Sequence, residues 1–107
     1  MNIFIVAVDP HSCQIECSED RWKYILRKHP EVNGYENYVK EAIENPENGI
    51  AYSSNTRTDR RIYYKKIAGK RAEIKVVAQI HSDDFGEIIT AHLCSNRPSG
   101  EIPIWQT

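Results

Sequence analysis

The sequence predicts an α+β fold in which two helices pack on one face of a twisted antiparallel β-sheet of about four strands. Helical periodicity is confined to the first half of the chain, between residues 18 and 45. Strand-like segments follow one another in the second half, at 61–67, 73–81 and 87–93. Only short turns separate these segments, and such turns favour antiparallel neighbours.

The amino-terminal segment 3–8 is apolar and predicts a further strand, which ends at Asp9-Pro10. Residues 14–17 are its possible hairpin partner. The apolar run is too short for a membrane span and lacks a basic leader, so we expect no membrane association.

Both helices carry start and stop signals. The first is expected to begin after Ser18, whose side chain can cap it, and to end at Pro30, because the residue before a proline is pushed out of the helical region. Residues on one face of this helix recur with helical spacing: Trp22, Ile25, Leu26 and His29. The second helix follows Asn33-Gly34 and closes at Asn45-Pro46.

The length of 107 residues allows a single domain, 1–107, with one two-layer core. A formal net charge of −1 gives no global attraction to nucleic acid, so such binding needs a local cluster of cations. Residues 57–75 contain that cluster, although such a run is also typical of a solvated hairpin surface: Arg57, Arg60, Arg61, Lys65, Lys66, Lys70, Arg71 and Lys75. The odd number of cysteines, three, indicates reduced thiols and a cytoplasmic location.

Strand alternation predicts a face of the sheet that is free of helices, the open face. If Ile74 and Val76 enter the core, Lys75 and Gln79 point the other way, as do Thr90 and His92 in the next strand. Residues 62–67 can pair in two registers, one that buries Ile62 and Tyr64 and one that buries Tyr63 and Ile67. We choose the register that buries Ile62 and Tyr64 and places Tyr63 and Lys65 on the open face.

Four strings resemble a known pattern: WKYILRKHPE (22–31), VKEAIENP (39–46), YYK (63–65) and IITAH (88–92). The pattern is similar to the phage and bacterial nucleases grouped as the barnase, EndoU, colicin and RelE superfamily (BECR fold), especially its small phage-associated branch. The resemblance covers about residues 22–93 and places a nuclease-like core at about 18–94. It implies a barnase-like endoribonuclease that needs neither metal nor cofactor and acts as a toxin. It also implies RNA as substrate, with tRNA as one candidate, and an antitoxin or immunity protein as partner.

The positions that match the family are His29, Lys65, Thr90 and one of Tyr63 or Tyr64. His92 stands where many members have tyrosine or phenylalanine. In the implied reaction the ribose 2′-oxygen attacks the adjacent phosphorus, which requires a base, an acid and cations. His29 or His92 would serve as base or acid, because histidine titrates near the working pH.

The remaining candidates support that reaction. Lys65 and Arg61 would stabilise the transition state, Thr90 would bond a phosphate oxygen, and Tyr63 would stack on a base or donate a proton. Residues expected to bind RNA lie along the basic strands: Arg60, Arg61, Lys66, Lys75 and Gln79.

Each candidate also has a structural explanation. His29 can cap the carboxyl end of the first helix, Lys65 can be plain surface, and Thr90 suits a strand. A domain that only binds RNA or protein through the basic sheet face is therefore the alternative function. A zinc site is a third, because three potential ligands fall close together: His11, Cys13 and Cys17. No second pair of ligands follows at zinc-site spacing, and we expect no metal.

Overall fold

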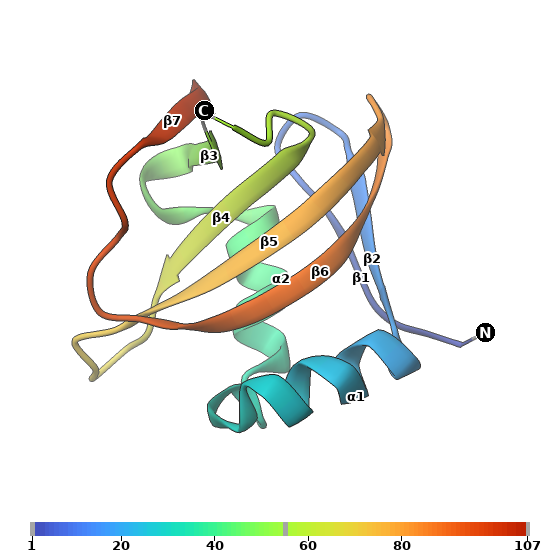
Figure 1. The fold of residues 1–107 in the computed structure, drawn as a ribbon, viewed down its shortest axis with the longest axis vertical. Coiled ribbons are helices and arrows are strands. Elements are labelled where there is room, and N and C mark those ends of the chain that lie inside the picture. Colours follow the sequence, from blue (N-terminus) through green and yellow to red (C-terminus); the bar gives the residue numbers. More distant parts are fainter. Residues whose placement is uncertain (1, 55, 107) are drawn as a thin grey trace.

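The computed structural model describes residues 2–54 and 56–106, and Figure 1 shows their arrangement. Two α-helices and two short 3₁₀ turns lie in the first half of the chain: α1 Glu19–Lys28, η1 Pro30–Val32, α2 Glu36–Glu44 and η2 Glu47–Gly49. The strands are β1 Ile3–Val8, β2 Gln14–Ser18, β3 Ile50–Ser54, β4 Arg60–Lys66, β5 Glu73–Ser82, β6 Phe85–Cys94 and β7 Glu101–Gln106. No helix in the described ranges is both long enough and apolar enough to cross a bilayer.

The strands form one seven-stranded mixed sheet in the order β1-β2-β6-β5-β4-β3-β7. The fold is α+β with two helices, but the prediction of about four strands, all antiparallel and arranged as in barnase, is wrong. The β1–β2 hairpin joins β6 through a parallel pairing of Gln14–Glu16 with Phe85–Glu87. At the opposite side β3 and β7 extend the sheet as an antiparallel pair. The sequence predicts an irregular tail after Cys94, because that segment contains Pro98, Gly100 and Pro103. The structure instead shows the strand β7 there, at the edge of the sheet, where Pro103 is tolerated.

The first helix begins and ends where its sequence signals predict. Ser18 is the N-cap, and its Oγ accepts a hydrogen bond of 3.1 Å from the backbone N–H of Arg21. His29 is the C-cap, and its backbone N–H donates to the carbonyl of Ile25 at 2.7 Å. Trp22 and Ile25 bury the apolar side of the helix. This leaves the other side of α1 to solvent.

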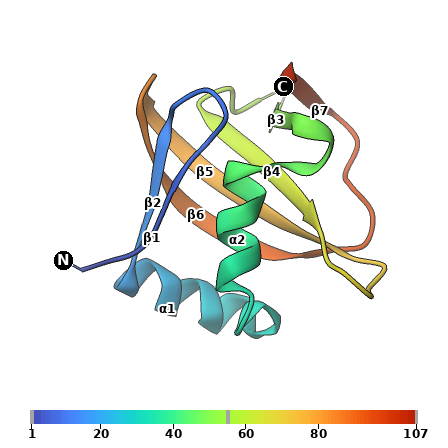
Figure 2. The same cartoon turned by 180° about the vertical axis from the view of Figure 1, so that it is seen from behind.

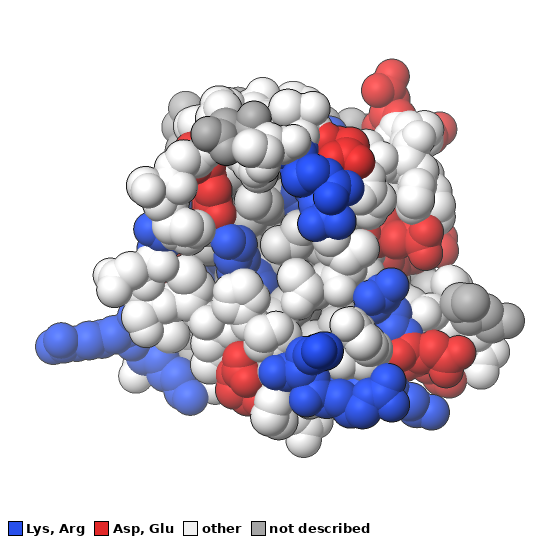
Figure 3. Space-filling view, viewed as in Figure 1, with Lys and Arg blue, Asp and Glu red and all other residues white. Residues whose placement is uncertain are grey.

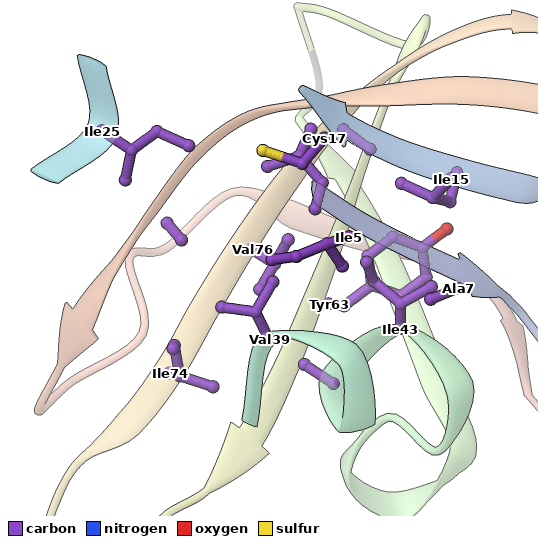
Figure 4. Packing of buried hydrophobic residues seen from close by; sticks show 14 of the residues in the cluster. Ile5, Ala7, Ile15, Cys17, Ile25, Val39, Ile43, Tyr63, Ile74 and Val76 are labelled. Atoms are coloured by element: carbon purple, nitrogen blue, oxygen red, sulfur yellow. The ribbon is translucent and has the colours of Figure 1, made fainter. Parts of the chain in front are cut away.

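The second helix lies behind the sheet and contacts β1, β4 and β5, as seen from behind in Figure 2. We call this covered side the helix face and the opposite side, which faces the viewer in Figure 1, the open face. The core lies between α2 and the helix face, where Val39 and Ile43 meet Ile5, Tyr63 and Val76 (Figure 4). β1 and β2 also contribute residues to this hydrophobic core.

The register of β4 is opposite to the one chosen from the sequence. Tyr63 pairs with Val76, and Lys65 pairs with Ile74, so both lie on the helix face. Tyr64 pairs with Lys75 and therefore lies on the open face. Ile62, Tyr63 and Tyr64 are all buried, so β4 has cover on both faces and its apolar residues do not alternate. The sequence pattern could not distinguish the two registers for this reason.

Candidate functional site

His29 and His92 lie side by side although they are distant in the sequence. Their ring centroids are 5.1 Å apart, with an angle of 31° between the ring planes. β2 covers only the first residues of β6, and beyond them α1 and η1 contact that strand. This contact brings the carboxyl end of α1, and with it His29, next to the half of β6 that carries His92.

The imidazole of His92 is held in a setting that favours its neutral form. Burial lowers its pKa, and the nearby His29 and Lys75 lower it further, whereas Glu31 and Glu101 act in the opposite direction. Its Nδ1 is buried and has no hydrogen-bond partner among the described residues. A neutral imidazole can accept a proton at one ring nitrogen, and because Nδ1 is buried a substrate could reach only Nε2.

His29 is in a different setting. Its side chain is 35% exposed, and its Nδ1 lies 3.5 Å from Oε2 of Glu31. A protonated His29 would therefore form an ion pair with this carboxylate at the surface. Both side chains are partly exposed, but their neighbours differ, because His92 has Lys75 beside it whereas the Nδ1 of His29 lies next to the Glu31 carboxylate.

Lys75 is the cation nearest to this pair in the sheet. It is the cross-strand neighbour of His92 on one side and of Tyr64 on the other. Its Nζ forms an ion pair of 2.8 Å with Oε2 of Glu101, and both side chains are mostly buried. The Tyr64 hydroxyl donates to Oε1 of the same carboxylate at 2.5 Å. Burial raises the pKa of Tyr64, and the bond to Glu101 raises it further, so Tyr64 stays protonated.

The segment after β6 folds over the open face beside this group. Arg97 donates from Nε and Nη2 to Glu73 at 2.9 and 2.8 Å and from Nη1 to the Tyr52 hydroxyl at 2.9 Å. Its guanidinium lies 4.2 Å from the ring centroid of Tyr64. Tyr64 is completely buried as a result, although it lies on the face without helices.

Three of the predicted site residues lie away from the histidines, on the helix face. Lys65 donates from Nζ to the backbone carbonyl of Asn45 at 2.9 Å. Tyr63 and Arg61 both bond Oδ2 of the buried Asp9, at 2.8 and 2.6 Å. Tyr63 is fully buried and burial raises its pKa, so it can neither stack on a base nor donate a proton in catalysis. The predicted convergence of Tyr63, Lys65 and Thr90 on one face is therefore wrong.

The other predicted residues lie on or near the open face. Thr90 pairs with Val77 and shares that face with His92. Arg60 bonds Gln79 across the strands at 3.4 Å, and Gln79 in turn donates to Asp59 at 2.8 Å. Lys66 is exposed at the end of β4. Arg60 and Gln79 therefore form a polar cluster of their own at the other end of the strands.

Sequence reasoning missed three charged residues at or beside the site, namely Glu31, Arg97 and Glu101. Glu101 and Arg97 belong to the tail, which its prolines and glycine predicted to be irregular. Glu31 follows His29 by two positions, and this spacing was a usable signal. The proposed zinc ligands do not form a site, because no three His, Cys, Asp or Glu side chains within 2–54 and 56–106 are placed to hold a metal. Cys13 and Cys17 lie in the core, where burial raises the pKa of Cys17 to about 12.

Comparison of the chain with protein-family models, with curated proteins and with solved structures finds no match in any of the three.

Proposed function

We propose that this protein is an endoribonuclease that cleaves RNA without a metal ion, using His92 as the base and His29 as the acid. The observation that carries the proposal is the pair of imidazole rings 5.1 Å apart on one side of the molecule. Internal transfer at a phosphodiester needs a proton acceptor and a proton donor that can both reach the same phosphodiester. Two adjacent histidines in unlike surroundings supply such a pair.

In the proposed reaction, His92 removes the proton from the ribose 2′-hydroxyl, and the 2′-oxygen forms a bond to phosphorus. The bond from phosphorus to the 5′-oxygen breaks, and the proton on His29 passes to that oxygen. The products are a 2′,3′-cyclic phosphate and a free 5′-hydroxyl. No electrons are exchanged, and no further reactant is consumed.

The assignment of roles follows from the surroundings of each ring. Burial keeps His92 neutral at pH 7, as a base must be. His29 is half-exposed, and its Nδ1 lies 3.5 Å from Oε2 of Glu31, so we assign it the role of the acid. Each positioned proton-transfer group typically contributes a factor of about 10²–10⁴ in rate.

Lys75 is the cation that we assign to the phosphate in the transition state. It lies opposite His92 across the strands, and its ammonium is now paired with Glu101. A bound phosphate would share this ammonium with the carboxylate, so Glu101 sets how strongly Lys75 attracts anions. Thr90, on the same face as His92, can donate to a phosphate oxygen.

The free thiols support a cytoplasmic location for the proposed activity. Cys13, Cys17 and Cys94 are all free, and a reducing environment preserves free thiols. We therefore place the proposed activity in the cytoplasm, where RNA is abundant.

The test is incubation of the purified protein with total tRNA in excess chelator, followed by analysis of the new RNA ends. The proposal predicts fragments that carry 2′,3′-cyclic phosphates and 5′-hydroxyls. These fragments should disappear with His92→Ala and with His29→Ala. The matched control is His81→Ala, which removes an exposed histidine bonded to Glu87 and should cleave normally.

Two outcomes would overturn the proposal. One is cleavage that stops in chelator, because the reaction as written needs no metal. The other is a shift of tRNA in a gel with no cleavage by the wild-type protein, which would favour a domain that only binds RNA.

A further inference from the structure

The solvent-facing side of α1 carries an exposed aromatic ring surrounded by cations. Tyr24 is 41% exposed. The guanidinium of Arg21 lies 5.2 Å from its ring centroid, that of Arg27 lies 5.9 Å away, and the ammonium of Lys28 lies 5.9 Å away. Residues three and four positions apart are neighbours on a helix, so this spacing gathers the cations around the ring.

The three cations around Tyr24 form no ion pair with an acid in the part of the chain that the structure describes. The ion pairs of Lys and Arg in the described ranges involve Arg57, Arg61, Lys75 and Arg97, and none involves α1. Three of the eight cations at 57–75, Arg57, Arg61 and Lys75, are thus paired with an acid within the fold, whereas none of the three α1 cations around Tyr24 is paired in the described ranges. Figure 3 shows a band of Lys and Arg atoms over the region where α1 lies in Figure 1.

The charges along α1 have a direction. A hollow at the amino end of the helix is lined by Asp20 and Glu87 beside Arg21 and Tyr24. These carboxylates would repel a polyanion, whereas Arg27 and Lys28 at the other end would attract it. Phosphates are therefore drawn toward the carboxyl end of α1, which is the end that carries His29.

The spacing fits a continuous path to the histidine pair. Lys28 immediately precedes His29, and Tyr24 lies about 7.5 Å before His29 along the helix axis at about 1.5 Å per residue and about 140° around it at about 3.6 residues per turn. A base on Tyr24 and a phosphate at the edge of the histidine pair could therefore belong to one stretch of a few nucleotides.

We infer that this side of α1 binds the single-stranded segment of RNA next to the cleaved phosphate, with a base stacked on Tyr24 and phosphates on Arg27 and Lys28. The inference rests on the proposed function, which makes RNA the substrate. Single-stranded nucleic acid is recognised by aromatic rings for the bases and cations for the backbone, and α1 presents both within 6 Å (5.2–5.9 Å). An acidic peptide would use the cations but has no base for the ring.

The test measures binding of a fluorescent single-stranded 2′-O-methyl RNA oligonucleotide, which lacks the attacking hydroxyl and cannot be cleaved by the proposed reaction. Tyr24→Ala should raise Kd about tenfold, whereas Tyr24→Phe, which keeps the ring, should restore binding. The double change Arg27→Ala with Lys28→Ala should raise Kd and reduce its dependence on salt. The control Lys40→Ala, at an exposed position on α2, should bind like the wild type.

Cleavage supplies a second readout. Tyr24→Ala should lower, about tenfold, the ratio of kcat/KM for a long oligonucleotide to kcat/KM for a dinucleoside monophosphate, because the short substrate cannot reach the ring. Circular dichroism of each variant shows that it is folded.

The outcomes separate this inference from the proposed function. If the wild type cleaves RNA but Tyr24→Ala leaves Kd and the kcat/KM ratio unchanged, the inference is overturned and the proposed function stands. If the wild type cleaves nothing but binds the oligonucleotide through Tyr24, the inference stands and the proposed function fails. Tyr24-dependent binding of a glutamate-rich peptide, with no binding of the oligonucleotide, would show that α1 recognises an acidic protein instead.

Discussion

Lys75 lies directly opposite His92 across the antiparallel pair of β5 and β6. Directly opposed residues on one face have Cβ atoms about 5 Å apart, so the ammonium and the imidazole can contact the same phosphate. Lys65 cannot contact that phosphate, because it lies on the helix face and its Nζ donates to the backbone carbonyl of Asn45. The two lysines therefore form a matched pair for testing the site.

Lys75→Met should lower kcat/KM for RNA about tenfold or more, because a cation at the phosphate is lost while the aliphatic stem is largely kept. Lys65→Met should leave kcat/KM unchanged. Steady-state cleavage of a fluorogenic oligonucleotide measures both variants. Equal losses in the two variants would mean that the lysine opposite His92 has no special role.

The stability of the fold should depend on pH through His92. The pKa of His92 in the folded state is lowered from 6.5, mainly by burial, whereas the unfolded imidazole keeps its ordinary value. The unfolded state therefore binds more protons between these two values, and the free energy of unfolding falls as the pH drops below about 6.5. Above that pH the contribution of His92 is constant.

Urea unfolding at a series of pH values from 5 to 8 measures this effect. His92→Gln should flatten the acid limb of the stability curve. His81→Gln, which removes an exposed imidazole, should keep the wild-type slope. An unchanged acid limb in His92→Gln would contradict the neutral state that the base requires.

Asp9 should be a major determinant of stability, although it has no part in the chemistry. Its carboxylate is buried and accepts hydrogen bonds from the backbone N–H groups of His11 and Cys13 as well as from Arg61 and Tyr63. It thereby ties the β1–β2 turn to β4. Removal of one partner from a buried ion pair leaves an uncompensated charge.

Asp9→Ala should lower the free energy of unfolding by about 3–5 kcal/mol. Asp83→Ala, at an exposed position in the turn between β5 and β6, should change it by less than about 0.5 kcal/mol. Urea titration of the two variants decides the matter. Similar midpoints for Asp9→Ala and the wild type would show that the Asp9 network is dispensable.

Local signals in the sequence predicted the helices well. Ser18 and Pro30 mark where α1 starts and stops, and the spacing of Trp22 and Ile25 identifies its buried side. These features depend on neighbours within a few residues, which is why sequence alone reveals them. The cation cluster on the exposed side of α1 could also have been predicted, because Tyr24 has cations at i−3, i+3 and i+4. The RNA-binding residues were instead assigned to the denser basic run at 57–75.

The sheet was harder to predict because its register depends on distant partners. β4 is buried on both faces, so its apolar residues do not alternate, and Tyr63 and Tyr64 were assigned to the wrong faces. The strand β7 contains Pro103, and only its edge position makes that residue acceptable. The parallel pairing of β2 with β6 has no local signature at all.

The candidate site was predicted in part. His29 and His92 were both named from the sequence, and the structure brings their rings together. Glu101 and Arg97 were missed, because their roles arise only when the tail folds back onto β4 and β5. Sequence pattern identifies residues with useful chemistry, whereas their grouping depends on long-range contacts.

The most direct test of the central claim is the single-turnover cleavage rate of one RNA oligonucleotide in excess chelator, measured for the wild type, His29→Gln, His92→Gln and the double variant. If the two rings act as one acid and base pair, each single change should lower the rate by about 10²–10⁴-fold. The double change should cost much less than the product of the two single effects, because such groups act as a unit. A wild-type protein that leaves the oligonucleotide intact, or a His92→Gln variant that cleaves it at the wild-type rate, would contradict the account.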